Sequence, residues 1–442
     1  MRRRPRDGRA FPAHPSAPPT GTNGIAAPAR RLGALAEREF RLLFLGRTIS
    51  FVGGAFANIA LAFAVLDLTG SKADLGYVLA ARTVPMVAFL LVGGIWADRL
   101  PRHHVMVASN VLSGLSQATI AVLLFSGRAE IWQLAVLAAV NGASSAFFFP
   151  ASSGIIPQTV PEPLLQEANA VLRLGRNASV IVGGTIAGFV VYATSPATGI
   201  AVDAATFLLA AALTAAMRLP KSLHMESSNF LADLALGWRE FTGRAWLWTI
   251  VIQFGFVNAV QQGSEGVLGP AVSKEHYHGA AGWGLIGAAQ AVGLVVGGVL
   301  MLRLRPRRML LVATLGFLLS VPLLFGLAIS LPLAGVLVLG VLAGIGTETF
   351  GVLWDTTMQQ EIPQDRLSRV YSYDALGSFA LIPLGLAFAG PVAKVAGTRA
   401  TLFAAGAISL TATLAVLLVS EVRNLRRRGP VVPHEPAVEA AV

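Results

Sequence analysis

The residues of this sequence that are best suited to chemistry are a few carboxylates inside long apolar runs. Glu348 lies well within one such run and shares a helical face with Gly351, Asp355 and Gln359, at spacings of three, four and four. An ionisable group costs at least ~2.5 kcal/mol at the centre of a bilayer, so it is expected to face the interior of a helical bundle. Glu348 is therefore the first candidate for a reversible proton carrier, the alternative being a structural acid paired with another helix. The further candidates for proton coupling are Glu265, Asp355 and Asp374.

A second polar group follows one face of the apolar run at about 246–270. Asn258, Gln262 and Glu265 fall at i, i+4 and i+7, and Gln261 and Gln253 broaden the stripe. Such a stripe is typical of the wall of a water-filled cavity that offers hydrogen bonds to a small molecule. Hydrogen bonding between helices is the alternative, since membrane bundles use it commonly.

Further candidates for the cavity come from other apolar runs. Arg47 and Asn58 share a face of the first apolar run, although Arg47 lies near the membrane surface, where a long cationic side chain can instead reach lipid phosphate. Asn141 and Trp354 complete the candidate cavity residues. Arg82 and Asp203 are expected to be structural partners rather than ligands.

The composition identifies the elements that must position these groups as membrane-spanning helices. Of the 442 residues, 54% are hydrophobic and only 13% are charged, about half the charged fraction of a soluble domain. Mean hydropathy is +0.65. The apolar runs recur near the length of ~20 residues that crosses a bilayer, which predicts an all-α, polytopic membrane protein.

Composition and missing motifs also exclude several functions. The chain has no cysteine, so disulfide and thiol chemistry are excluded. Its net charge of +11 comes from basic residues beside apolar spans rather than from one basic patch with interleaved aromatics, which argues against nucleic-acid binding. No phosphate-binding loop, Gly-x-Ser-x-Gly elbow or convincing metal site occurs, so we expect neither an enzyme nor a bound cofactor.

The apolar runs predict twelve transmembrane helices in two sets of six. Their approximate ranges are 40–66, 75–97, 104–126, 131–154, 166–194, 197–218, 246–270, 281–302, 309–330, 332–354, 368–394 and 399–420. The sequence thus divides into a disordered basic tail (1–39), a first half (40–218), a polar central loop (219–245), a second half (246–420) and a short tail (421–442).

The distribution of basic residues predicts the orientation of these helices. Of the 34 lysines and arginines, most fall on the side that holds both termini and the central loop. The other side holds Lys72, Arg128, Lys274, Lys394 and Arg399. By the positive-inside rule, both termini and the central loop are predicted to be cytoplasmic.

The two halves are predicted to be copies of one another. At a constant offset of 202, the first half matches the second at several positions. The matching pairs are Pro161 and Pro363, Leu165 and Leu367, Gly175 and Gly377, Gly183 and Gly385, and Gly188 and Gly390. Two six-helix sets with the same orientation form a parallel repeat, whose halves can rock about a central site.

The charged turn at 94–102 carries a family resemblance. The pattern Gly94-x-x-x-Asp98-Arg99-x-Pro101-Arg102 resembles the loop signature between the second and third spans of the major facilitator superfamily, in which glycine usually stands at the position of Pro101. The resemblance implies a gating role for Gly94, Asp98, Arg99 and Arg102, with Asp98 facing the start of the eleventh span near Arg369. A solvated acid in a turn is the alternative.

Further stretches resemble one branch of that superfamily. Gly46-Arg47-Thr48-Ile49-Ser50, Trp354-Asp355-Thr356-Thr357-Met358-Gln359 and Arg369-Val370-Tyr371-Ser372-Tyr373-Asp374 are similar to the proton-driven macrolide-efflux and enterobactin-exporter-like branch. Two features of drug antiporters are missing: Ala138 stands where an arginine often assists proton coupling, and Gly183-Gly184 replaces the usual Gly-Pro.

The resemblance implies a secondary transporter in the inner membrane, with protons and a hydrophobic or amphipathic small molecule as its partners. We expect a functional monomer, surrounded by lipid, that exports the molecule by proton antiport. Uptake of a nutrient by proton symport on the same fold is the second hypothesis. A non-transporting membrane sensor or partner protein is the third.

Overall fold

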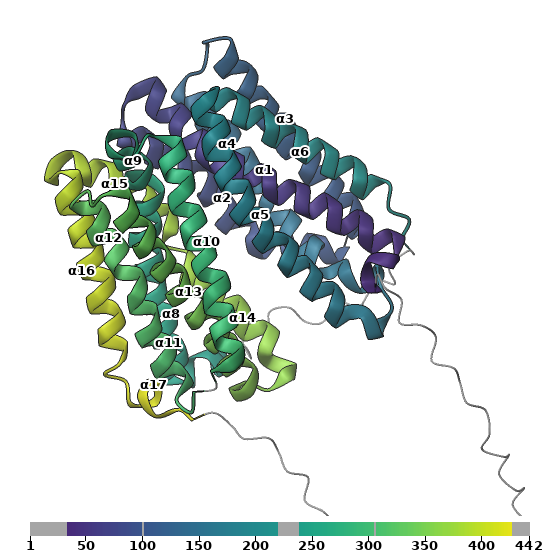
Figure 1. Cartoon of the computed structure of the whole chain (residues 1–442). Helices are drawn as coiled ribbons and strands as arrows, with labels where there is room; N and C mark the ends of the chain where they lie inside the picture. The colour runs from purple at the N-terminus through teal and green to yellow at the C-terminus, as the bar shows by residue number, and fades with distance from the viewer. Residues whose placement is uncertain (1–32, 100, 220–237, 305, 427–442) are drawn as a thin grey trace, which may run out of the picture.

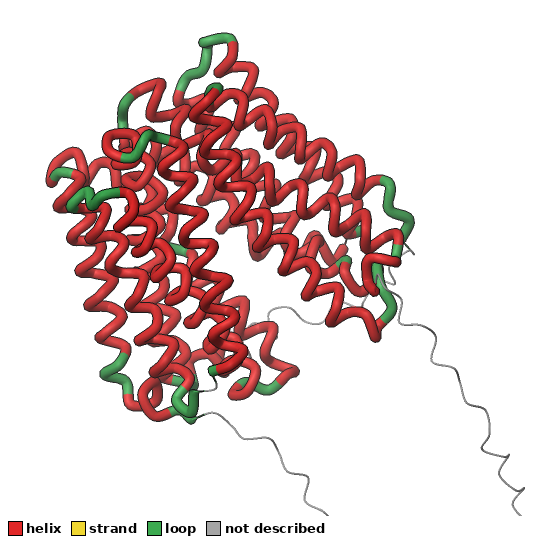
Figure 2. The backbone as a smooth tube through the Cα atoms, in the orientation of Figure 1, coloured by secondary structure: helices red, strands yellow, loops and turns green. Residues whose placement is uncertain are grey.

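The computed structural model describes residues 33–99, 101–219, 238–304 and 306–426. All regular elements in these ranges are helical (Figures 1 and 2). In the described ranges, ten helices are long and apolar enough to cross a membrane. The other two of the twelve spans are α2 (Lys72–Arg99) and the segment from α8 (Ala245–Gly263) to α9 (Gly269–His276). The predicted all-α fold of two six-helix sets is confirmed. Residues 1–32, 220–237 and 427–442, which hold most of the predicted tails and central loop, lie outside the described residues.

Each of the six spans of the first half is one helix. They are α1 (Arg38–Thr69), α2 (Lys72–Arg99), α3 (Arg102–Phe125), α4 (Ile131–Gly154), α5 (Leu165–Ala193) and α6 (Pro196–Ala215). The short 3₁₀ helices η1 (Gly33–Ala36), η2 (Ile156–Gln158) and η3 (Glu162–Leu164) flank them. Helix α1 ends where Gly70 adopts a left-handed conformation with φ of 65°, which glycine accepts without a Cβ clash.

The spans of the second half are more broken. Its elements are α8 (Ala245–Gly263), the π-helical turn η4 (Ser264–Leu268), α9 (Gly269–His276), α10 (Ala280–Arg303), α11 (Met309–Phe317), η5 (Leu318–Ser320), α12 (Val321–Ala328), α13 (Leu333–Glu361), α14 (Gln364–Phe379), α15 (Ile382–Ala396), α16 (Thr398–Val416) and α17 (Ser420–Asn424).

Three spans that the sequence predicts as continuous are therefore interrupted. The breaks precede α9, α12 and α15, and each of these helices has proline in its first turn: Pro270, Pro322 and Pro383. Proline lacks the N–H that would continue the preceding helix, and it is tolerated in a first turn, where that N–H has no helical partner. Helix α13 also runs to Glu361, seven residues beyond the predicted end at 354.

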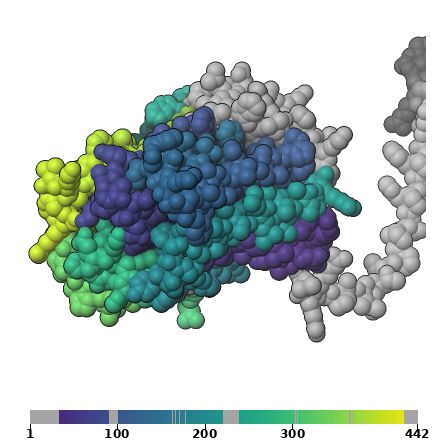
Figure 3. All heavy atoms as spheres, turned by 90° about the horizontal axis from the view of Figure 1, so that it is seen from above, coloured from purple at the N-terminus to yellow at the C-terminus, as the bar shows by residue number. Residues whose placement is uncertain are grey.

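The two halves form two bundles that diverge along the molecule. Figure 1 shows both described chain ends, at η1 and α17, at one end of the bundles, which we call the termini end. The opposite end, with the α1–α2, α9–α10 and α15–α16 connections, is the far end. The bundles lie together at the far end and apart at the termini end (Figures 1 and 2). Seen from the far end, the atoms of the two halves abut (Figure 3).

The hydrophobic core shows the same divergence. One cluster of buried side chains is shared by both halves and includes Leu66, Leu75 and Val191 from the first, with Val272 and Leu402 from the second. Two further clusters each belong to a single half. One surrounds Met106 and Ile155 in the first half, and the other surrounds Ile250 and Met358 in the second. The halves therefore share a core at the far end and have separate cores at the termini end.

Two matched helix pairs join the halves. Helix α5 packs on α10, and α15 packs on α2. A Cβ on Gly188 would lie 2.7 Å from the carbonyl oxygen of Ala280, and one on Gly390 would lie 2.5 Å from the backbone nitrogen of Ala73. Since Gly188 and Gly390 are related by the offset of 202, the repeat places a glycine at each close approach, as helix packing in lipid requires.

Candidate functional site

A pocket that holds several of the candidate residues lies within the second half. It has a volume of about 490 Å³ and is formed by α8, α13 and α14. Its lining is mostly apolar and aromatic. The lining residues are Ile250, Phe254, Asn258, Phe350, Trp354, Asp355, Tyr371, Asp374, Ala375, Ser378 and Phe379. A few polar groups in an aromatic pocket of this size are typical of a small-molecule site.

The two carboxylates of this pocket are held by neutral donors. Trp354 Nε1 and Ser378 Oγ donate to Asp374 at 3.1 and 3.2 Å. Tyr371 donates its hydroxyl to Asp355 Oδ1 at 3.2 Å. Asn258 Nδ2 donates to the carbonyl oxygen of Ser378 at 2.9 Å, which fixes α8 against α14. Four sequence candidates, Asn258, Trp354, Asp355 and Asp374, thus meet in one pocket.

Glu348 lies two turns of α13 away from Asp355, nearer the middle of the helix, and faces positive charge from the other half. It is half-buried and interacts electrostatically with Arg173 and Arg176 of α5. Arg47 of α1 in turn feels the charge of Arg176, and its guanidinium lies 5.8 Å from the centre of the Phe51 ring. The first half therefore presents cations to the space between the halves, and the second half presents carboxylates.

The predicted amide stripe of the seventh span divides in the structure. Asn258 lines the pocket, whereas Gln253 donates to Thr413 at 3.1 Å and Gln261 donates to Ser320 at 3.2 Å, both within the second half. Gln262 is exposed, and Glu265 lies in the π-helical turn and accepts from Gln290 Nε2 at 3.1 Å. Some residues of the stripe therefore line a cavity, and others form hydrogen bonds between helices.

The remaining candidates of the first half contribute two separate hydrogen bonds and one buried amide without a partner among the described residues. Arg82 donates to Asn58 Oδ1 at 3.0 Å. Asp203 is fully buried and accepts from Gln117 Nε2 at 2.6 Å. Asn141 is 2% exposed, and neither atom of its amide has a hydrogen-bond partner in the described structure. Gln117, Asn141 and Asp203 are therefore buried within the first half, whereas the Asn58 side chain is exposed.

Charged side chains also join the halves at the far end. Lys72 Nζ lies 3.3 Å from Glu275 Oε1 and 2.8 Å from Thr398 Oγ1. Lys274 Nζ lies 2.5 Å from Asp67 Oδ1 and donates to the carbonyl oxygen of Leu66 at 3.0 Å. Each half thus contributes one lysine to a pair with an acid of the other.

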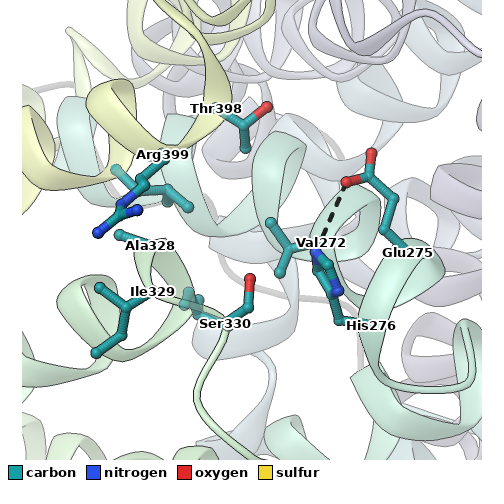
Figure 4. Close-up of a pocket in the computed structure, with 10 residues that line it drawn as sticks. Val272, Glu275, His276, Ala328, Ile329, Ser330, Thr398 and Arg399 are labelled. Carbon is teal, nitrogen blue, oxygen red and sulfur yellow. Dashed lines mark ion pairs between the residues drawn. The ribbon is translucent and has the colours of Figure 1, made fainter.

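A smaller pocket lies beside these pairs. It has a volume of about 250 Å³, and Glu275, His276, Ser330, Thr398 and Arg399 surround it (Figure 4). The dashed line in Figure 4 joins His276 Nε2 to Glu275 Oε2 at 4.0 Å. Because Glu275 also pairs with Lys72, this pocket adjoins the contact between the halves.

The predicted gate is only partly described. The surroundings of Gly94 and the side chains of Asp98 and Arg99 in α2, and of Arg369 in α14, lie outside the described part of the structure. Arg102 is described: it begins α3 and donates to the carbonyl oxygen of Gly154 at the end of α4. This hydrogen bond ties α3 to α4 within the first half.

The sequence patterns do not reveal the contact between Asp203 and Gln117 or the far-end charge pairs. Asp203 and Gln117 are 86 residues apart, and their helices meet only through packing. A signal did exist for Asp203, since an ionisable residue within a membrane span indicates a functional site with a polar partner. The far-end lysines were counted only for orientation.

Comparison with known proteins identifies the family. The sequence profile of the Major Facilitator Superfamily matches residues 43–263 and 254–440, so one copy of the match falls on each half. The chain belongs to the Major Facilitator Superfamily. It is accordingly a multi-pass membrane transporter and not an enzyme, and the family predicted from the turn at 94–102 is confirmed.

Curated relatives match nearly the whole chain. The multidrug efflux pump Tap of Mycolicibacterium fortuitum is 28% identical over 401 residues, which cover 87% of this chain and 96% of the relative. Macrolide efflux protein A of Streptococcus pyogenes is 20% identical over 397 residues, covering 88% of this chain and 97% of the relative. Both carry efflux names, in agreement with the branch that the sequence stretches indicate.

Solved structures share the fold. A bacterial homolog of the human lysosomal transporter Spinster, in an inward-facing and occupied conformation, has a TM-score of 0.68 at 15% identity, covering 88% of this chain and 98% of that one. The nucleoside transporter NupG has a TM-score of 0.67 at 12% identity and covers 86% of this chain and 98% of that one.

Proposed function

We propose that this protein exports a hydrophobic or amphipathic small molecule across the cell membrane in exchange for protons, by alternating access. The observation that carries the proposal is the divided core: the halves share buried side chains at the far end and have separate cores at the termini end. With the termini end assigned to the cytoplasm, as the basic residues predict, the divided core supports a state that is open to the cytoplasm and closed to the outside.

The pocket of α8, α13 and α14 is the proposed substrate site. Its volume of about 490 Å³ suits a drug-sized molecule, and its aromatic walls suit an apolar one. Asp355 and Asp374 give the pocket two polar anchors, which favour an amphipathic ligand over a purely apolar one. Arg47 and the other arginines of the first half would face the bound molecule across the space between the halves.

We assign the coupled proton to a carboxyl group that water can reach from each side of the membrane in turn. Glu348 is the first candidate, because it lies toward the space between the halves opposite Arg173 and Arg176. Protonation from outside and proton release inside would drive the cycle if substrate favours the deprotonated form. Asp98 is proposed to stabilise the opposite, outward-facing state, as the loop resemblance implies.

The relatives support the direction of transport. Tap is named a multidrug efflux pump and the streptococcal protein a macrolide efflux protein, and both match this chain over most of its length. A macrolide such as erythromycin is therefore a reasonable first substrate to test.

The test uses purified protein in proteoliposomes with radiolabelled erythromycin. When the vesicle interior has the higher proton concentration, the proton gradient should drive accumulation of erythromycin inside the vesicles. A protonophore should abolish this accumulation. Glu348→Gln should reduce this accumulation at least tenfold and flatten its pH dependence, while the control Asp74→Asn, an aspartate in the first turn of α2, should resemble wild type. Movement toward the side of lower proton concentration would indicate symport. No gradient-driven movement of erythromycin or of a panel of other drugs would contradict the proposal.

A further inference from the structure

A buried acid of the first half has no role in the transport site described above. Asp203 lies in α6, is 0% exposed, and is surrounded by α1, α3 and the Arg82 side chain of α2. Gln117 Nε2 donates to its Oδ2 at 2.6 Å. The other carboxyl oxygen, Oδ1, has no hydrogen-bond partner among the described residues.

The packing around Oδ1 leaves no room for another side chain. It faces the backbone of α1 at Gly53, where a Cβ would come within 2.8 Å of Oδ1 and still closer to the Thr206 hydroxyl. That hydroxyl is already committed, because it donates to the backbone oxygen of Asp203 at 2.7 Å. The free oxygen can therefore accept a proton without displacing any side chain.

The charges around Asp203 do not neutralise it. Arg82 is the charged group that faces it: the two interact electrostatically, but the guanidinium NH1 donates to Asn58, and no ion pair joins Arg82 to Asp203 in the described structure. Among the ionisable side chains of the neighbouring helices α1, α3 and α5, Arg47, His103 and Arg176 lie in the parts of these helices nearer the termini end, and Asp67 lies at the far end of α1. A buried carboxylate with one unbonded oxygen is costly, so the site favours a species that can bind that oxygen.

Asp203 and the polar groups near it lie at similar distances from the far-end surface. Asp203 is seven residues from the start of α6, Arg82 and Asn141 are ten from the starts of α2 and α4, and Gln117 is eight from the end of α3. All these helix ends belong to the far end. At 1.5 Å per residue, these groups lie roughly 10–15 Å below the far-end surface, between that surface and the opening at the termini end.

We infer that Asp203 is a proton-binding carboxyl of the transport cycle, located in the first half and separate from the substrate pocket of the second. A proton from water on the far side binds Oδ1, forming a neutral carboxylic acid, and later leaves to water on the other side. Gln117 orients the carboxyl group by donating to Oδ2, and Arg82, whose guanidinium is oriented by Asn58, interacts electrostatically with the ionised form. This inference rests on the proposed proton antiport and adds a group to it.

Proton binding is tested without any substrate. Infrared difference spectra of the purified protein, recorded across a pH series, should contain a carboxylic-acid C=O band that Asp203→Asn removes. Gln117→Leu keeps the carboxyl but removes its donor, and it should shift the pH at which that band disappears. The control Asp74→Asn should leave the band unchanged. Spectra of wild type and Asp203→Asn that are identical at every pH would overturn the inference.

Coupling is tested in the proteoliposomes. Asp203→Asn should lower gradient-driven accumulation of erythromycin at least tenfold while exchange of labelled for unlabelled erythromycin, without a gradient, stays within twofold of wild type. Loss of both activities would assign Asp203 a structural role and overturn the inference, as would sodium-driven accumulation that is indifferent to pH. If wild type itself shows no gradient-driven accumulation, the proposed antiport fails, whereas the infrared result still decides whether Asp203 binds a proton.

Discussion

The two halves of this transporter share a topology but place their acids in different environments. In the second half, Asp355 and Asp374 line an aromatic pocket of about 490 Å³. In the first half, Asp203 is enclosed within the bundle and bonded to Gln117. At the offset of 202, Asp355, Asp374 and Asp203 correspond to Ser153, Leu172 and Ala405, none of which is ionisable.

This difference shows what the internal repeat preserves. The glycines at the contacts between α5 and α10 and between α15 and α2 recur in both halves, because the backbones approach too closely there for a side chain. The acids do not recur. Structural positions are thus shared by the halves, while the positions of the acids differ, which is consistent with a substrate site in the second half alone and an additional proton-binding group in the first.

The largest effect is expected where the halves are alike. Gly188→Val or Gly390→Val places a side chain against backbone atoms of the other half, and overpacking of this kind costs about 1–3 kcal/mol, equivalent to a shift of up to about a hundredfold in the closure equilibrium. Erythromycin transport should fall to near background, and the protein should remain open to the outside.

The open state can be measured directly because the chain contains no cysteine. A protein carrying Gly54→Cys, at a site with open space around it, should react faster with an impermeant maleimide from outside when Gly188→Val is also present. Gly184→Ala is the matched control on the same helix, since its Cβ would meet nothing within 4 Å. Equal labelling rates with and without Gly188→Val would show that this contact does not control closure.

A smaller effect is expected where the halves differ. Asp374→Asn keeps the shape of a side chain that accepts from Trp354 and Ser378 but removes its charge from the pocket. A hydrogen bond to a charged group contributes about 1.5–3 kcal/mol, so kcat/KM for erythromycin should fall by roughly tenfold or more. Leu172→Asn, which places an asparagine at the equivalent, buried apolar position of the first half, tests whether the effect is specific to the pocket. Equal losses in the two variants would remove the functional distinction between the halves.

The smallest effect is expected at the far-end ion pairs. Lys72 and Lys274 are partly exposed, and such pairs contribute only about 0.2–1 kcal/mol each. The double variant Lys72→Gln/Lys274→Gln should therefore raise outside labelling of the Gly54→Cys protein by a few-fold, while Lys394→Gln, a neighbouring lysine of α15, should not. Reduced labelling in the double variant would indicate that the pairs do not stabilise the closed far end.

The sequence by itself determined the spans, the repeat and the family. Long apolar runs have one stable structure in a bilayer, because a backbone without water must form its hydrogen bonds within helices. Twelve spans and two halves therefore followed from hydropathy, and the turn at 94–102 indicated the superfamily. The breaks before α9, α12 and α15 were missed because Pro270, Pro322 and Pro383 lie in runs that remain apolar on both sides.

Only the tertiary structure decided which polar groups meet. Periodicity placed Asn258 and Gln262 on one face of a helix, but the rotation of that helix against its neighbours turned Gln261 toward Ser320 and Asn258 toward the pocket. The same applies to Asp203, whose partner Gln117 comes from another helix. The rotation of a helix in a membrane is set by packing between whole helix faces, and small residues such as Gly188 and Gly390 allow the closest contacts. The rotation therefore depends on all the neighbouring helices at once. The residue pattern within a single helix does not determine it.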